Sequence, residues 1–282
     1  MIKYLVTGHR GFIGSQIFEA LPSLETIGID LKEGEDILEQ LPDIQVDTVF
    51  HLAAQPRVEY SVENPSRTLR HNVLGTSKVL EWAHRHGAKR VVFSSSSAIY
   101  GNGAGPTSPY GLHKLMNELE CKLYSELYGL DTVCLRYYNV YSERQSFTGA
   151  YSTVISAWME MLRTGQPLRV DGDGEQTRDY IHVDDIVSAN MFCASQEGDF
   201  KGACYDVGSG KSISLNKIKE FVEDRYNVDY QYAEERIGDV KHTSANVEPL
   251  RDIGWEAKIS IEDGLEKCFP AAYTNAQQKF IN

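Results

Sequence analysis

The sequence predicts an α/β fold, a doubly wound parallel sheet with a trimmed edge and a smaller, interleaved C-terminal substrate lobe. Three observations predict it. The apolar run KYLVTG leads through glycines into a helical segment. Further apolar runs at 47–54, 89–96 and 131–141 alternate with segments of helical periodicity, as strands and crossover helices of a parallel sheet do. After Tyr141 this alternation gives way to loop-rich pieces between shorter elements.

The composition is that of a globular chain. Its 282 residues are 41% hydrophobic and 24% charged, which is enough apolar material for a substantial core. The net charge of -12 argues against a nucleic-acid partner, because such binding needs a surplus of Lys and Arg. No apolar stretch suits a membrane span, and the five cysteines are scattered, so we expect a cytoplasmic protein without disulfides or a metal site.

A glycine motif follows the first apolar run. In GHRGFIG, Gly8, Gly11 and Gly14 have G-x-x-G-x-x-G spacing, and a helix is predicted from Phe12. A strand that leads through glycines to a helix N-terminus suits the pyrophosphate of a dinucleotide. Asp30 ends the next apolar run, where a carboxylate binds the ribose diol and repels a 2'-phosphate. NAD is therefore the expected cofactor, in preference to NADP.

The chain after Asp30 is short. Only five residues, 31–35, precede Asp36, whereas a parallel crossover needs about a dozen. The second helix and third strand usual in such sheets cannot both fit, so we expect the sheet to be trimmed at this edge. Asp36 and Ile37 are still expected beside the adenine.

The predicted helix 109–128 carries the strongest catalytic candidates. It places Tyr110 and Lys114 one turn apart on one face. A lysine ammonium beside a phenol favours the ionised phenol, so Tyr110 could act as a base near neutral pH, with a hydroxyl from Ser96 or Ser97 beside it. The alternative is an ordinary amphipathic helix with a surface tyrosine and lysine. One stripe of this helix is apolar and comprises Leu112, Leu115, Leu119, Leu123 and Leu127.

Eight motifs together resemble a known family. In chain order they are TGHRGFIG, HLAA, FSSSSAIYG, SPYGLHK, LRYYNVY, GDGEQTRDYIHVDD, YDVGSG and RIGD. They resemble the extended short-chain dehydrogenases that epimerise or dehydrate nucleotide sugars. The resemblance covers nearly the whole chain and implies a Rossmann NAD-binding domain over 1–141 and 180–210. It implies a nucleotide-sugar-binding lobe over 142–179 and 211–282.

The resemblance also implies roles for individual residues. Tyr110 takes the place of the catalytic base, Lys114 that of its partner, and Ser96 that of the hydroxyl sharing the O4 atom of the sugar. The residues expected at NAD are Gly8, Gly11, Phe12, Ile13, Gly14, Asp30, Asp36, Ile37, Leu52, Ala53, Ala54, Asn72, Ser94, Tyr110, Lys114 and Tyr137. Those expected at a UDP-sugar are Ser96, Ser97, Asn139, Val154, Arg178, Arg236, Asp239 and Thr243. A buried structural amide remains an alternative for Asn139, and a surface ion pair for each arginine taken alone.

The reaction expected from the resemblance is a 4-epimerisation. Family dehydratases carry an Asp-Glu pair where this chain has Ser97 and Ala98, and glucuronate epimerases usually have Thr at Asn139 and Arg at Glu59. Thr243 stands where glucose-restricted epimerases tend to carry tyrosine. The smaller threonine leaves room for an acetamido group, so N-acetylated hexoses are favoured as substrates. The alternatives are a UDP-glucuronate 4-epimerase, a dehydratase, a reductase or a degenerate nucleotide-sugar binder. Family members pair through the helices near 65–86 and 110–128, so a homodimer is expected.

Overall fold

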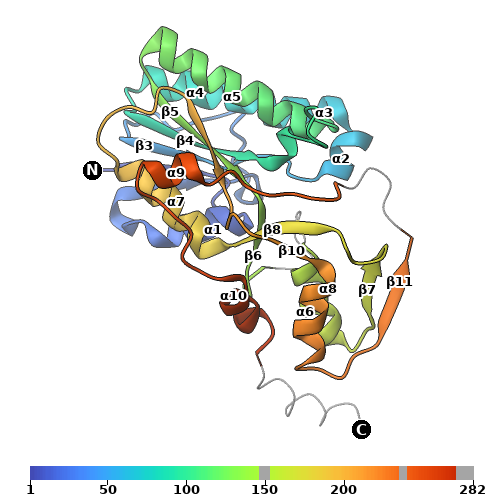
Figure 1. Cartoon of the computed structure of the whole chain (residues 1–282). Coiled ribbons are helices and arrows are strands. Elements are labelled where there is room, and N and C mark those ends of the chain that lie inside the picture. Colours follow the sequence, from blue (N-terminus) through green and yellow to red (C-terminus); the bar gives the residue numbers. More distant parts are fainter. Residues whose placement is uncertain (146–152, 235–239, 271–282) are drawn as a thin grey trace. The chain divides into compact units, whose positions relative to one another are not determined.

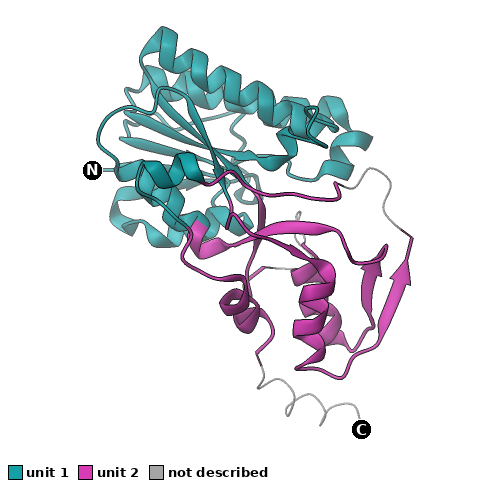
Figure 2. Cartoon of the chain, in the orientation of Figure 1, with its two compact units in different colours: residues 1–137, 186–207, 248–256 teal, residues 138–185, 208–247, 257–282 magenta. Residues whose placement is uncertain are grey.

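A computed structural model describes residues 1–145, 153–234 and 240–270. The chain divides into two compact units, shown in teal and magenta in Figure 2. Unit 1 comprises Met1–Tyr137, Ile186–Val207 and Glu248–Glu256. Unit 2 comprises Tyr138–Asp185, Gly208–Val247 and the residues from Ala257.

Unit 1 is built on a six-stranded parallel sheet with the order β2-β1-β3-β4-β5-β9. Its strands are β1 (Tyr4–Thr7), β2 (Thr26–Ile29), β3 (Thr48–His51), β4 (Arg90–Ser96), β5 (Asp131–Tyr137) and β9 (Ala203–Val207). Its helices are α1 (Phe12–Ala20), α2 (Val58–Glu63), α3 (Pro65–Leu69), α4 (Gly75–Arg85), α5 (Pro109–Tyr128), most of α7 (Val183–Ser195) and α9 (Glu248–Asp252). Figure 1 shows α4 and α5 on one face of this sheet and α1 and α7 on the other. The predicted doubly wound parallel sheet is confirmed.

The trimmed edge is also confirmed. In the described part of the chain β2 is the outermost strand, and after it only the 3₁₀ turn η2 (Leu31–Glu33) and irregular chain lead to β3. β3 pairs with the opposite side of β1, in the register Val6↔Phe50. The strand order therefore reverses at β1, and a parallel sheet offers its ligand crevice at the carboxyl ends of strands beside such a reversal.

Helix α5 buries its polar face and exposes its apolar one. Its fully buried residues include His113, Lys114, Asn117 and Glu118. The leucine stripe lies outward, with Leu112, Leu119, Leu123 and Leu127 between 48% and 68% exposed. Core packing on this side of the sheet comes from other residues, among them those of α4. These four leucines therefore do not pack against the sheet.

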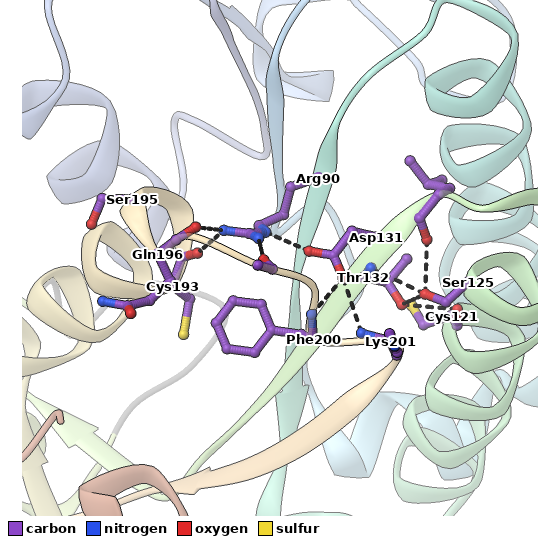
Figure 3. Close-up of polar contacts among 12 residues, drawn as sticks. Arg90, Cys121, Ser125, Asp131, Thr132, Cys193, Ser195, Gln196, Phe200 and Lys201 are labelled. Atoms are coloured by element: carbon purple, nitrogen blue, oxygen red, sulfur yellow. Dashed lines mark hydrogen bonds and ion pairs between the residues drawn. The ribbon is translucent and has the colours of Figure 1, made fainter. Parts of the chain in front are cut away.

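A buried ion pair ties the start of β4 and β5 to the chain before β9 (Figure 3). Arg90 Nε lies 2.6 Å from Asp131 Oδ2, and these paired residues begin the two strands. Arg90 also donates to the carbonyl oxygens of Cys193, Gln196 and Gly198. The other oxygen of Asp131 accepts from the main-chain N–H groups of Phe200 and Lys201. This contact network satisfies both buried charges and fixes the entry into β9.

Unit 2 is assembled from two small sheets and three helices in its described residues. The sheet β10-β8-β6 comprises Ser212–Ser214, Thr177–His182 and Asn139–Tyr141, and the sheet β11-β7 comprises Tyr230–Ala233 and Leu168–Asp171. The helices are α6 (Val154–Thr164), α8 (Leu215–Glu223) and α10 (Ile261–Cys268). One apolar cluster joins them, with Trp158, Leu168 and Phe269 nearly inaccessible to solvent.

The two units divide differently from the expected domains 1–141 with 180–210 and 142–179 with 211–282. The apolar run 131–141 is not one strand, because β5 ends at Tyr137 and β6 pairs with β8 in a separate sheet. Residues 138–141, 180–185 and 208–210 therefore belong to unit 2. Conversely, 248–256 belongs to unit 1, where Trp255 donates to Ser188 of α7. No helix in the described residues is long and apolar enough to cross a membrane.

Candidate active site

The glycine motif forms a turn too tight for side chains. Gly8 has φ +76°, and a Cβ there would lie 2.8 Å from the main-chain nitrogen of Ala53. A Cβ at Gly14 would lie 2.1 Å from the carbonyl oxygen of Gly8. Gly11 precedes α1 and provides no side-chain cap, and Phe12 and Ile13 form the first residues of the helix. The N–H groups of this helix start are thus suited to an anion that approaches the main chain closely.

Asp30 lies at the end of β2, beside this turn. Its Oδ2 accepts from Arg10 N at 2.8 Å and its Oδ1 from Lys32 N at 2.9 Å. Each carboxylate oxygen keeps further acceptor capacity, which a ribose diol can use. Asp36 accepts from Leu38 N, and the buried Ile37 lies so close to Gly75 that a Cβ there would be 2.9 Å from Ile37 Cδ1.

The end of β3 is tied to the end of β1. Leu52 N donates to the Thr7 carbonyl at 3.1 Å and Ala53 N to Thr7 Oγ1 at 3.3 Å, while Ala54 follows, half-buried. The predicted cofactor residues 52–54 therefore lie next to Gly8, at the reversal of strand order.

A chain of hydrogen bonds continues through the buried His51. Its Nδ1 lies 2.7 Å from Thr7 Oγ1 and its Nε2 3.0 Å from Thr76 Oγ1. Thr76 Oγ1 donates to the Asn72 carbonyl at 2.6 Å, so it accepts from His51, which fixes the imidazole as the neutral Nε2–H tautomer. Burial, with the charge of Lys114, lowers the pKa of His51 to about 3.

Asn72 lies in the π-helical segment η3 (Arg70–Leu74), between α3 and α4. Its side chain exchanges two hydrogen bonds with the main chain of Gln55, at 2.7 and 3.0 Å. Its carbonyl also accepts from Asn117 of α5 at 2.9 Å. Asn72 thus links the chain after β3 to α5.

The turn that follows Ser96 packs closely on the first turn of α5, which carries Tyr110. Ser96 Oγ accepts from Ala98 N at 3.2 Å and begins the 3₁₀ turn η4 (Ser97–Ile99). A Cβ at Gly111 would lie 2.4 Å from the Ala98 carbonyl oxygen, so the first turn of α5 packs directly on η4. Tyr110 N donates to Ser61 Oγ of α2 at 3.1 Å. Glycine beside Tyr110 is therefore required for this approach.

Lys114 lies one turn beyond Tyr110 and is 4% exposed. Its Nζ donates to the Ser94 carbonyl at 2.5 Å, and lies 4.7 Å from the Phe93 ring centroid and 5.9 Å from that of Tyr110. Burial lowers the pKa of Lys114 to about 8. Lys114 Nζ thus lies on the same side of α5 as the Tyr110 ring, and its hydrogen bond goes to Ser94; the effect of its charge on the Tyr110 phenol stays a prediction.

Ser94 and Tyr137 lie at the ends of neighbouring strands. Their hydroxyls are 3.0 Å apart, and Asn190 of α7 lies within hydrogen-bonding distance of the Tyr137 hydroxyl. Burial raises the pKa of Tyr137. Ser94, Lys114 and Tyr137 therefore form one connected set, and their contact with NAD stays a prediction.

Sequence reasoning missed a second polar set beneath the serines. Glu118 of α5 accepts from Ser95 Oγ at 2.5 Å and from Arg136 Nη2 at 2.8 Å. Arg136 donates to the Tyr100 hydroxyl, which donates to Asp206. Burial and the bond to Asp206 raise the pKa of Tyr100 to about 12, so this tyrosine stays protonated. The available signal was Glu118 itself, eight residues after Tyr110 and thus on the same helix face.

Unit 2 holds the other predicted substrate residues. Asn139 Nδ2 donates to the Asp179 carbonyl at 3.0 Å and lies 3.4 Å from Thr243 Oγ1, which also accepts from Asp179 N. Arg178 Nη1 donates to the Thr177 and Lys241 carbonyls. Val154 begins α6, at its cluster of apolar residues. Arg236 and Asp239 lie outside the described residues.

Asp179, which the sequence did not single out, organises this part of unit 2. Its buried carboxylate accepts from the main-chain N–H groups of Ser209, Gly210 and Ala245. Burial raises its pKa, and these hydrogen bonds oppose that change. Asp179 thus fixes the chain that leads to Thr243. Its strand, β8, reads TRDYIH, so no apolar pattern around this acid marked it out in the sequence.

Comparison with known proteins decides the family. The model of the NAD dependent epimerase/dehydratase family matches residues 4–208. The chain belongs to this family. A putative UDP-glucose 4-epimerase of Methanocaldococcus jannaschii is 32% identical, over 93% of this chain and 96% of the relative.

The structure is also similar to solved structures of UDP-sugar 4-epimerases. The UDP-N-acetylglucosamine 4-epimerase of Methanobrevibacter ruminantium, in complex with UDP-N-acetylmuramic acid, has a TM-score of 0.87 and 32% identity, over 96% of this chain and 98% of that one. The UDP-glucose 4-epimerase of Thermotoga maritima, with UDP-glucose, has a TM-score of 0.84 and 30% identity, over 100% of both chains.

The residues of this family member fit NAD. The glycine turn leaves main-chain space that a Cβ would fill at Gly8 and Gly14, α1 presents a helix start beside it, and Asp30 offers carboxylate acceptors. These are the three features that a pyrophosphate and a ribose diol require. Among the described residues, no group of three or more His, Cys, Asp or Glu side chains could hold a metal ion.

Proposed function

We propose that the protein is an NAD-dependent UDP-sugar 4-epimerase. The observation that carries the proposal is the arrangement on α5, where Lys114 Nζ lies 5.9 Å from the Tyr110 ring centroid, while Gly111 lets the Tyr110 turn pack on the chain after Ser96. We take Tyr110 as the base, Lys114 as the buried cation and Ser96, near the carboxyl end of β4, as the hydroxyl donor. This is also the end of the sheet at which the glycine turn lies.

Tyr110, Lys114 and Ser96 have different roles in the proton transfer at the sugar. Tyr110 takes the proton from the C4 hydroxyl of the sugar and later returns one to it. Lys114 favours the ionised phenol by its charge, which the low-dielectric surroundings strengthen. Ser96 donates a hydrogen bond to the same sugar oxygen. NAD, when bound, supplies the acceptor and donor of the C4 hydride, and the 4-keto sugar turns before the hydride returns to its other face.

The chain after Ser96 favours epimerisation over dehydration. Elimination of water calls for a further acid and base at the sugar, and Ser97 and Ala98 have no carboxyl group to supply them. The nearby acid Glu118 is engaged by Ser95 and Arg136. An epimerase needs one proton and one hydride moved in each direction, which Tyr110 and NAD provide.

We assign the binding of the UDP-sugar to residues of unit 2. The proposed contacts are Asn139, Arg178 and Thr243, together with Arg236 and Asp239, which lie outside the described residues. The N-acetylated pair, UDP-N-acetylglucosamine and UDP-N-acetylgalactosamine, is the first choice of substrate. Thr243 is small, and the family member with the TM-score of 0.87 is named for UDP-N-acetylglucosamine. UDP-glucose and UDP-galactose are the second choice, since other relatives carry that name.

One experiment tests both reaction and substrate. The protein is incubated separately with UDP-glucose, UDP-N-acetylglucosamine and UDP-glucuronate, and the anomeric protons are followed by NMR. A new galacto-configured signal, largest with the N-acetylated sugar, is expected. No conversion of any of the three by protein shown to bind NAD would contradict epimerisation of these sugars. It would favour a different nucleotide sugar, a reductase or a degenerate binder.

Thr243→Tyr tests the choice of sugar. A tyrosine there would crowd the acetamido group, so kcat/KM should fall for the N-acetylated pair and change little for the simple hexoses. Equal losses for both pairs, or no loss for either, would remove Thr243 from the specificity of the enzyme.

We also propose a homodimer in a reducing, cytoplasmic setting. The exposed leucine stripe of α5 is apolar surface that a second copy can cover. All five cysteines are free, as in proteins of reducing compartments.

A further inference from the structure

Glu33, in the short turn after β2, binds both side chains of the glycine turn. Its Oε2 lies 3.1 Å from His9 Nε2. Its Oε1 accepts from Arg10 Nε at 2.6 Å and also contacts Arg10 Nη2. One carboxylate thus holds and neutralises the Arg10 guanidinium, while the Arg10 side chain as a whole is 55% exposed.

The same two segments are joined a second time through Asp30. Asp30 accepts from Arg10 N, and Lys32 Nζ donates to the Arg10 carbonyl at 2.8 Å. Arg10 is therefore fixed by its main chain to Asp30, the carboxylate placed for the adenosine ribose, and by its side chain to Glu33.

The His9 ring adds rigidity to this arrangement. It is 4% exposed and lies 4.9 Å from the Phe18 ring, centroid to centroid. A Cβ at Gly28 would come within 2.3 Å of it, so β2 has room for the ring only because Gly28 lacks a side chain. Glu33 therefore binds a partner that cannot move away, and its carboxylate stays beside Arg10.

We propose that Glu33 sets the preference for NAD over NADP by occupying Arg10. A 2'-phosphate on the adenosine ribose carries nearly two negative charges, and an arginine near the end of β2 is the side chain that accommodates it. Arg10 is at that place, but its guanidinium is engaged by Glu33, whose charge adds to the repulsion from Asp30. The selectivity for NAD over NADP then depends on two carboxylates. Asp30 repels the 2'-phosphate directly, and Glu33 acts by engaging Arg10. This inference depends on the NAD dependence of the family and not on the sugar chemistry.

Binding measurements on the purified protein test the inference. Kd values for NAD and for NADP are determined by isothermal titration calorimetry for the wild type and for Glu33→Gln, which keeps a hydrogen-bond acceptor for His9. Glu33→Gln should tighten NADP about tenfold at low salt and leave NAD within about threefold, because a freed guanidinium gains a charge-assisted pair with phosphate. The gain should shrink in 0.5 M salt, since the site is partly exposed.

Two further variants separate the contact from mere charge. Glu35→Gln removes a neighbouring exposed carboxylate that forms no ion pair with Arg10 in the described part of the chain, and should leave the NADP affinity nearly unchanged. Arg10→Ala with Glu33→Gln should abolish the gain. An unchanged NADP affinity in Glu33→Gln, or an equal gain without Arg10, would overturn the inference, provided that thermal melting shows folded protein. Because no sugar is turned over, absent epimerase activity would contradict the proposed function and leave this result standing.

Discussion

Lys114 donates from Nζ to the main-chain oxygen of Ser94, with the two atoms 2.5 Å apart. The bond joins the fourth strand of the sheet to the helix that carries Tyr110, and it holds a cation away from water. A lysine buried there lowers the stability of the folded state, because burial disfavours its charged form. In the proposed mechanism the ammonium acts through the effect of its charge on Tyr110, and it does not contribute to stability.

Tyr110→Phe removes the proposed base and leaves the ring in place. We expect kcat to fall by about two to four decades, the range for loss of a general base, in protein that still contains NAD. Tyr128→Phe, at the exposed end of the same helix, is the matched control and should keep normal turnover. Near-normal turnover of Tyr110→Phe would remove it as the base.

Lys114→Met should stabilise the fold while impairing turnover. The pKa of Lys114 is lowered from 10.5 to about 8, so below pH 8 the folded state carries a buried charge at a cost of about 3 kcal/mol. This penalty is relieved as pH rises from 8 to 10.5, because only the unfolded state then still binds the proton. The lost bond to Ser94 offsets part of the gain, so Tm at pH 7 should rise by roughly 2–8 °C.

Thermal melts and steady-state kinetics check this prediction. kcat should fall at least about a hundredfold, since the phenol loses its neighbouring charge. Lys122→Met, exposed on the same helix, should change neither quantity appreciably. A fall in Tm for Lys114→Met would mean that the hydrogen bond outweighs the buried charge.

His51 predicts a loss of stability in acid. Its pKa is lowered to about 3, so between pH 6.5 and 3 the unfolded state binds a proton that the folded state does not. From this residue alone the free energy of unfolding should fall by up to about 1.4 kcal/mol per pH unit as pH drops through that range. Urea unfolding as a function of pH measures the slope. His51→Gln should flatten this slope, whereas the control His84→Gln, at an exposed position, should leave it unchanged. Identical slopes in the two variants would contradict the lowered pKa of His51.

The sequence predicted the parts of the molecule that local pattern controls. The bounds of α5 follow from Ser108, whose Oγ accepts from Gly111 N, from Pro109 at the first helical position and from Gly129 at the end. The trimmed edge followed from a simple count of residues after Asp30.

Longer-range packing had no comparable signal. An apolar stripe usually faces the core, yet Leu119 and Leu123 face outward, because the buried side of α5 is filled by polar groups whose partners are distant in sequence. The break between β5 and β6 likewise depends on the pairing of Asn139 with Tyr180, forty-one residues away, which no local apolar run encodes.

The outward leucines predict the assembly. Leu119→Glu puts a charge in the middle of the stripe and should convert a dimer of twice 31.7 kDa into a monomer at micromolar concentration, as measured by sedimentation velocity. Leu24→Glu is the control, because Leu24 is 89% exposed and lies outside α5. A wild-type protein that sediments only as a monomer would contradict pairing through this face.

Retention of a label at C4 tests the proposed reaction most directly. UDP-N-acetylglucosamine and UDP-glucose carrying deuterium at C4 are incubated in ordinary water with the protein and an equimolar amount of NAD, and the products are analysed by NMR and mass spectrometry. If hydride leaves and returns to the same carbon while Tyr110 handles only the O4 proton, a galacto-configured product should form with its deuterium still at C4. Galacto-configured product with hydrogen from solvent at C4, or none with either sugar, would contradict epimerisation by this route.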